Sequence, residues 1–116
     1  ISEMFIKEVD SPQLVSKMEE NDDLVIIDVR EMHEINRGTI QGAIPMPMAT
    51  IPVRLDEIPK DKEVVFICRS GARSGQVCMF LGQHGYENVI NLSGGIIGWV
   101  RSGYQPVLPD QVSSTY

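Results

Sequence analysis

The chain has 116 residues, of which 42% are hydrophobic and 22% charged, and its 10 basic against 16 acidic side chains give a formal net charge of −6. This length predicts one domain, and this composition argues against intrinsic disorder. The negative charge argues against non-specific nucleic-acid binding, which requires a basic face.

Cysteine content and hydropathy narrow the class of protein further. Two cysteines are too few for a disulfide-stapled scaffold, and no apolar run approaches the roughly 20 residues that cross a bilayer. The chain begins with Ile1 rather than Met, so we expect a trimmed product, which leaves room for a removed targeting segment. The cytoplasm is the default location, and no membrane partner is expected.

Short apolar segments along the chain predict strands. Residues 24–29 and 63–68 are apolar on both faces, which is typical of strands covered by helices on each side. Weak alternation over residues 4–9 predicts an edge strand. Shorter strands are expected within residues 42–47 and at residues 89–92.

Helix signals lie between these strands. Ser11 followed by Pro12 predicts an N-cap and the first turn of a helix that runs to Asn21. A short helix over residues 31–37 should stop at Gly38. Further helices are expected from residue 49 or 50 to residue 58, over residues 73–84 and over residues 95–101.

The alternation of strands and helices predicts an α/β fold, with a central, mostly parallel sheet of about five strands and helices on both faces. Ligands of such sheets bind beyond the carboxyl ends of the strands. Cys68 lies at that end of the strongest predicted strand.

The loop that follows this strand contains the candidate functional residues. Its sequence is Cys68, Arg69, Ser70, Gly71, Ala72, Arg73 and Ser74. The small residues let the backbone curl tightly, with Gly71 free to adopt a positive φ, so that successive N–H groups converge on one point. The next helix directs its positive end there, and two arginines add positive charge.

A thiolate in this cradle is stabilised relative to the thiol. Such surroundings lower a cysteine pKa from about 8.5 to about 3.5–7.5, which would make Cys68 a nucleophile at neutral pH. The alternative is a small core residue at a strand end. The two arginines, the glycine turn and the strand–helix context favour the functional interpretation.

Residues 68–73 resemble the six-residue active-site loop of rhodanese-like sulfurtransferases, Cys-x4-Arg. Asp-Val-Arg-Glu at 28–31, Gly-Thr-Ile-Gln-Gly-Ala at 38–43, Gly-Gly-Ile-Ile-Gly-Trp at 94–99 and Gly-Tyr-Gln-Pro at 103–106 are similar to other segments of this family. The resemblance implies one complete rhodanese-like domain over residues 1–107. The Pro, Ser and Gln content near the end of the chain predicts a poorly ordered tail over residues 108–116. Thr39 departs from the family, since many relatives have His there.

The resemblance implies that Cys68 takes the outer sulfur of thiosulfate or a similar donor, forms a persulfide, and passes the sulfur to cyanide, a thiol or a carrier protein. It implies no cofactor. The amides from Arg69 to Ser74 would hold the persulfide. Arg69 and Arg73 would orient the donor, or Arg73 would tie the loop to an acidic neighbour. Asp28 and Arg30 are expected to brace loops near the site.

Two alternatives from other classes stay open. Cys-dependent phosphatases and arsenate reductases use Cys-x5-Arg, and removing one residue shortens the loop by up to about 3.5 Å, which suits one sulfur atom better than a tetrahedral oxyanion. A non-catalytic regulatory module with this fold would usually lack the cysteine. Cys78 is expected to be a packing residue, and no metal-ligand spacing is present. The oligomeric state is not predicted.

Overall fold

A computed structural model describes residues 6–109 of the chain. It contains a five-stranded sheet in the order β1-β5-β4-β2-β3, and every neighbouring pair is parallel. The strands are β1 (Lys7–Val9), β2 (Val25–Asp28), β3 (Ile44–Pro45), β4 (Val64–Ile67) and β5 (Val89–Leu92). The predicted α/β class and five-stranded sheet are confirmed, and the sheet is wholly rather than mostly parallel.

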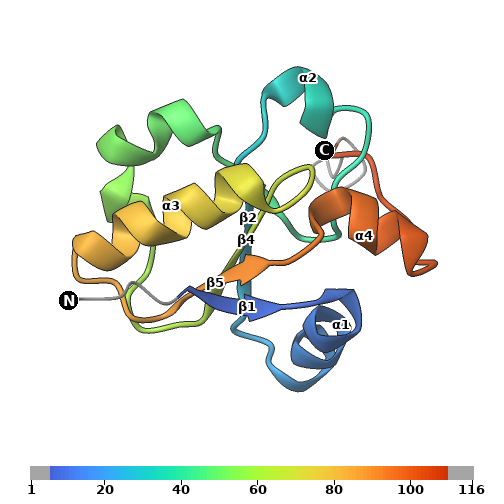
Figure 1. The fold of residues 1–116 in the computed structure, drawn as a ribbon, viewed down its shortest axis with the longest axis horizontal. Helices are drawn as coiled ribbons and strands as arrows, with labels where there is room; N and C mark the ends of the chain where they lie inside the picture. Colours follow the sequence, from blue (N-terminus) through green and yellow to red (C-terminus); the bar gives the residue numbers. More distant parts are fainter. Residues whose placement is uncertain (1–5, 110–116) are drawn as a thin grey trace, which may run out of the picture.

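Helices cover both faces of this sheet (Figure 1). They are α1 (Ser11–Glu20), α2 (Met32–Ile35), α3 (Ala72–Gln83) and α4 (Gly95–Arg101), with 3-10 helices η1 (Met48–Val53) and η2 (Leu55–Glu57). No helix of the described residues is long and apolar enough to cross a membrane.

The central strand β4 supplies both halves of the core, because its side chains alternate between faces. Val64 and Phe66 pack with α3 and η1, and Cys68, just beyond the strand, continues this row. Val65 and Ile67 pack on the opposite face with α1 and α4. Burial on both faces therefore explains the continuous apolar run, and it places Cys68 on the α3 side of the sheet.

Two predicted elements differ from the structure. The N-cap of α1 is Asp10 and not Ser11: its carboxylate accepts from the Gln13 N–H at 2.9 Å, while the Gln13 side chain accepts from the Asp10 N–H. This reciprocal pair satisfies two free helix donors. The helix expected from residue 49 or 50 to 58 is instead η1 and η2, because Pro52 has no N–H and the segment closes with shorter i to i+3 bonds.

The segment just before the predicted tail is attached to the domain. Val107 and Thr39 exchange two backbone hydrogen bonds of 2.8 Å, which hold the segment after α4 beside the loop after α2. Of the tail expected over residues 108–116, residues 110–116 lie outside the described residues, as do residues 4 and 5 of the predicted first strand.

Candidate active site

Cys68 lies between the carboxyl end of β4 and the start of α3. Gly71 is the N-cap of α3 with φ +103°, as the sequence predicted, and this left-handed turn directs its N–H onto the Cys68 Sγ at 3.0 Å. The Ser74 Oγ lies 3.4 Å from the same sulfur. The loop therefore closes around one sulfur atom.

These donors decide the protonation state of the thiol. Burial alone raises the pKa of Cys68, but the Ser74 hydroxyl and the backbone N–H groups of Ser74, Gly71 and Ser70 outweigh burial and bring the pKa below its ordinary value. A thiolate accepts hydrogen bonds more strongly than a thiol, so each donor favours the charged form. The loop thus contains the features of an activated cysteine.

Asn91 of β5 supports the loop from beneath. Its Oδ1 and the Cys68 Sγ share the single proton of the Ser74 hydroxyl, with Oδ1 the nearer acceptor. Its Nδ2 donates to the Gly71 carbonyl at 3.1 Å and to the Glu8 carboxylate at 2.8 Å. Asn91 is only 2% exposed. One buried amide therefore fixes Gly71 and Ser74, two of the three residues that donate to Cys68. Because Nδ2 donates to two acceptors, the orientation of the amide is determined.

The first turn of α4 holds the other side of the loop. The Ile96 N–H donates to the Cys68 carbonyl at 2.9 Å and the Ile97 N–H to the Arg69 carbonyl at 3.1 Å. A Cβ on Gly95, whose φ is +58°, would overlap both of these carbonyl groups. Glycine is required here because the helix backbone approaches the loop backbone directly.

The guanidinium of Arg73 is held by Glu34 of α2. Two parallel hydrogen bonds of 2.9 Å join the groups, and the Arg73 contact lowers the pKa of Glu34 to about 2. Of the two roles expected for Arg73, the structure therefore shows the second, an ion pair between the loop and an acidic neighbour.

Asp28 and Arg30 form a buried pair behind α2. The Arg30 guanidinium binds both Asp28 oxygens and donates to the Gly38 carbonyl, while the Thr39 hydroxyl donates to Asp28 at 2.8 Å. Thr39 thus supplies a further hydrogen-bond donor to the Asp28 carboxylate, at the position where many relatives have His. The pair braces the segment that carries Glu34, and it makes no hydrogen bond to the 68–74 loop.

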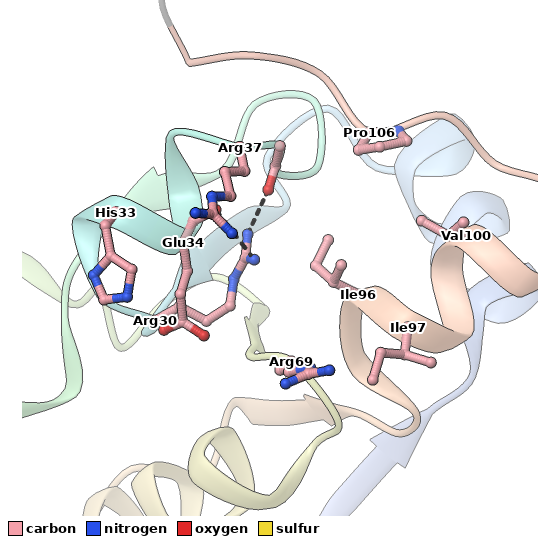
Figure 2. Close-up of a pocket in the computed structure, with 10 residues that line it drawn as sticks. Arg30, His33, Glu34, Arg37, Arg69, Ile96, Ile97, Val100 and Pro106 are labelled. Atoms are coloured by element: carbon pink, nitrogen blue, oxygen red, sulfur yellow. Dashed lines mark hydrogen bonds between the residues drawn. The ribbon is translucent and has the colours of Figure 1, made fainter.

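Arg69 is exposed at the edge of a pocket of about 510 Å³. Figure 2 shows the side chains of α2 on one side of this pocket and those of α4 on the other, with Arg69 between them. Arg69 therefore connects the 68–74 loop to a cavity of the size that small-molecule sites have.

The sequence predicted the contiguous loop but missed three residues that hold it: Glu34, Asn91 and Gly95. They lie 34 residues before and 23 and 27 residues after Cys68 in the chain, and their only local signals are a Glu on a short helix, an Asn in an apolar strand and a Gly-Gly pair before a helix. Cys78 is buried in the core, as a packing residue would be. Among residues 6–109, no three His, Cys, Asp or Glu side chains are grouped closely enough to hold a metal ion.

An α/β domain with a cysteine in a tight loop after the central strand defines a class of thiol-dependent domains, and comparison with known proteins identifies the family. The rhodanese-like domain model matches residues 11–102. The chain therefore belongs to the rhodanese-like family.

Relatives of known name agree with this assignment. A sulfurtransferase of Allochromatium vinosum is 47% identical over 106 residues, which cover 91% of this chain and 99% of the relative. A thiosulfate sulfurtransferase of Glaesserella parasuis is 34% identical, covering 79% and 85%. The crystal structure of a rhodanese-related protein of Thermoplasma volcanium has a TM-score of 0.80 at 29% identity, covering 88% and 98%.

Proposed function

We propose that this protein is a sulfurtransferase that carries sulfur on Cys68. The observation that supports this most directly is the closed set of donors around the Cys68 Sγ, which favours an anion the size of one sulfur atom. The names of the relatives support sulfur transfer as the general activity. Thiosulfate as the donor is our more specific proposal.

The reaction takes place in two half-reactions on one covalent intermediate. The Cys68 thiolate attacks the outer sulfur of thiosulfate; the new S–S bond forms as the bond to the sulfonate sulfur breaks, and sulfite leaves with the electron pair of that bond. Cys68 then carries a persulfide. A thiophilic acceptor such as cyanide or a thiolate attacks the outer sulfur and releases the Cys68 thiolate, so neither half-reaction needs an external oxidant or a cofactor.

The loop amides stabilise the charge at each stage. The persulfide is anionic, and the N–H groups of Ser70, Gly71 and Ser74 are already oriented toward the sulfur before it forms. Arg69 attracts the dianionic donor, because its side chain is exposed at the mouth of the site. Arg73 acts at longer range, since Glu34 holds its guanidinium.

The test is a mass measurement after incubation with thiosulfate. We expect the native protein to gain one sulfur atom on Cys68, the Cys68→Ser variant to gain none, and the matched Cys78→Ala variant to behave as the native protein. Steady-state rates with thiosulfate and cyanide should give the parallel reciprocal plots of a ping-pong reaction. An unmodified Cys68 together with turnover of an aryl phosphate would instead establish a phosphatase.

A further inference from the structure

We propose that Asn91 is a positioning residue of sulfur transfer, which holds the Ser74 hydroxyl while Cys68 carries sulfur and shares it with the Cys68 Sγ when the thiolate forms. The inference rests on the proposed function and concerns the two states of its covalent cycle. The Ser74 hydroxyl has one proton, and both the Asn91 Oδ1 and, at 3.4 Å, the Cys68 Sγ lie within hydrogen-bond distance of its oxygen. The hydroxyl therefore has two positions in which it can donate.

Burial confines the Ser74 proton to these two acceptors. Ser74 has no exposed surface, Asn91 is 2% exposed and Cys68 is 1% exposed. A buried hydroxyl that loses its acceptor costs the full desolvation of that group, so the proton goes to one of these partners in each state of the enzyme. The stronger acceptor of a given state receives it.

The relative strength of the two acceptors changes during the reaction. The charge of the resting thiolate makes the Cys68 Sγ a strong acceptor, which competes for the Ser74 proton with the nearer amide oxygen. When Sγ attacks the donor, its electron pair forms the S–S bond, and the negative charge of the persulfide then lies on the outer sulfur. The inner sulfur is now a weak, neutral acceptor, so the hydroxyl turns to Asn91. Removal of the outer sulfur returns the bonding pair to Sγ and reverses this rotation, and the Ser74 O–H bond stays intact throughout.

Neighbouring groups hold the Asn91 amide with its oxygen toward Ser74. Its Nδ2 donates to the Glu8 carboxylate at 2.8 Å and to the Gly71 carbonyl at 3.1 Å, so both N–H bonds are occupied and the amide cannot turn over. The charge of Glu8 polarises the amide and makes its oxygen a better acceptor. Gly75 leaves room for the amide, because a Cβ there would lie 3.4 Å from the Asn91 Nδ2.

This arrangement balances the two half-reactions. Without the Asn91 oxygen, the persulfide would leave a buried hydroxyl unpaired, and the equilibrium would favour the thiolate. Without the Ser74 hydroxyl, the thiolate would lose a donor, and the equilibrium would favour the persulfide. Removing Asn91 and removing Ser74 should therefore have opposite effects on Cys68, although the two residues belong to one hydrogen-bond network.

The first experiment measures the equilibrium between free and sulfur-loaded Cys68 by mass spectrometry, at a fixed ratio of thiosulfate to sulfite and at a pH where Cys68 is ionised in every variant. Asn91→Leu replaces the amide by an apolar group of the same shape and should shift the equilibrium about threefold toward the thiolate. Ser74→Ala should shift it about threefold toward the persulfide. Asn88→Leu is the matched control: the Asn88 Nδ2 also donates to two backbone carbonyl groups, outside the site, and its loss should leave the equilibrium unchanged.

A titration of Cys68 separates this inference from the proposed function, because it requires no sulfur transfer. In Asn91→Leu the Ser74 hydroxyl donates to Cys68 alone, so the pKa of Cys68 should fall below its native value. The Gly71 carbonyl still accepts from the Gly75 N–H at 3.0 Å, which keeps the turn in place. A residue that only held the loop would have the reverse effect, since a loosened loop loses donors to the sulfur.

The outcomes of these two experiments are distinct. In Asn91→Leu, a raised pKa of Cys68, or an equilibrium that is unchanged or moves toward the persulfide, would overturn the inference even if the native protein loads sulfur. Native protein that never loads sulfur, together with the lowered pKa in Asn91→Leu, would contradict the sulfur transfer and not the competition for the Ser74 proton.

A measurement on the native protein keeps the inference testable if Asn91→Leu does not fold. Hydrogen bonding to an amide oxygen moves the NMR signal of its carbonyl carbon downfield, so the Asn91 Cγ signal should move downfield when thiosulfate loads Cys68 and return when cyanide removes the sulfur. In Ser74→Ala this movement should be largely lost, and the Asn88 Cγ signal should not move in either protein. An Asn91 signal that moves equally with and without the Ser74 hydroxyl would overturn the inference.

Discussion

The two cysteines of this chain have similar burial and opposite chemistry. Cys68 is 1% exposed and Cys78 is 3% exposed, and both pack in the core on the same face of the sheet. Burial brings the pKa of Cys78 to about 12, and the negative charge of Glu8 adds to the effect. The pKa of Cys68 is lowered, because loop donors surround its sulfur. The surrounding N–H and O–H groups, and not accessibility alone, therefore determine which thiol reacts.

The largest expected difference is in alkylation rate. At pH 7 a thiol with a pKa of about 12 is ionised in about one molecule in 10⁵, so we expect iodoacetamide to modify Cys68 at least about 10³-fold faster than Cys78 in the folded protein. Peptide mass mapping over time measures both rates in one sample.

The matched control for that measurement is the denatured protein, in which both thiols have ordinary pKa values and should react at similar rates. The Cys78→Ala variant should retain the native Cys68 rate. Comparable rates of modification of the two thiols in the folded state would contradict the difference between their pKa values.

The next effect concerns the contact between α4 and the loop. Gly95→Ala should destabilise the protein by about 2–4 kcal/mol and abolish most sulfur transfer, because the added Cβ displaces the Cys68 and Arg69 carbonyl groups. Gly103→Ala is the matched control: its φ is +93°, with no atom within 4 Å of the added Cβ, so we expect about 1 kcal/mol and native activity. Urea denaturation measures both, and equal losses would show that only backbone conformation matters.

The sequence predicted those parts of the fold whose signal lies within one continuous stretch of residues. The strand at residues 24–29 and the strand at 63–68 were recognisable because burial on both faces leaves an uninterrupted apolar run, and the loop after Cys68 was recognisable because its residues are contiguous. The single helix predicted from residue 49 or 50 to 58 was wrong, since the spacing of apolar residues there suits a helix while Pro52 prevents continuous helical hydrogen bonds.

The support of the loop could not be predicted in the same way. Asn91 reaches Ser74 and Gly71 only because β5 lies beside β4. Glu34 reaches Arg73 only because α2 and the 68–74 loop both follow the carboxyl ends of neighbouring strands. A polar residue in a strand or a Glu on a short helix has no local periodicity that identifies its partner. Tertiary neighbours, once the strand order is known, supply that information.

Removing one donor should bring Cys68 closer to Cys78. Ser74→Ala deletes the hydroxyl at 3.4 Å, whose proton the thiolate shares with Asn91, so the pKa of Cys68 should rise and its alkylation at pH 7 should be slower. The pH dependence of alkylation measures the shift. Ser93→Ala removes a half-buried hydroxyl that donates to the Val9 carbonyl, away from Cys68, and it should leave the profile unchanged. A matching shift in both variants would contradict the role of Ser74.

The smallest expected effect is the loss of stability in Glu34→Gln, which removes the ion pair between Glu34 and Arg73. The pKa of Glu34 is about 2 in the folded protein, below its value of 4.5 in the unfolded chain, so the carboxylate stabilises the fold above pH 4.5 and this contribution is lost as pH falls from 4.5 toward 2. Because the Glu34 and Arg73 side chains are 22% and 34% exposed, we expect the variant to lose only about 1 kcal/mol at pH 7, measured by urea denaturation, and the difference to narrow below pH 4.5.

The same substitution should act on Cys68 in the direction opposite to Ser74→Ala. Without the carboxylate, the positive charge of Arg73 is no longer balanced, and that charge interacts with the Cys68 thiolate. The pKa of Cys68 should therefore fall further, while Glu57→Gln, which frees Arg54 outside the site, should leave it unchanged. A rise in the Cys68 pKa on Glu34→Gln would mean that the ion pair matters chiefly by holding the loop closed around the sulfur, because a loosened loop loses the donors that separate Cys68 from Cys78.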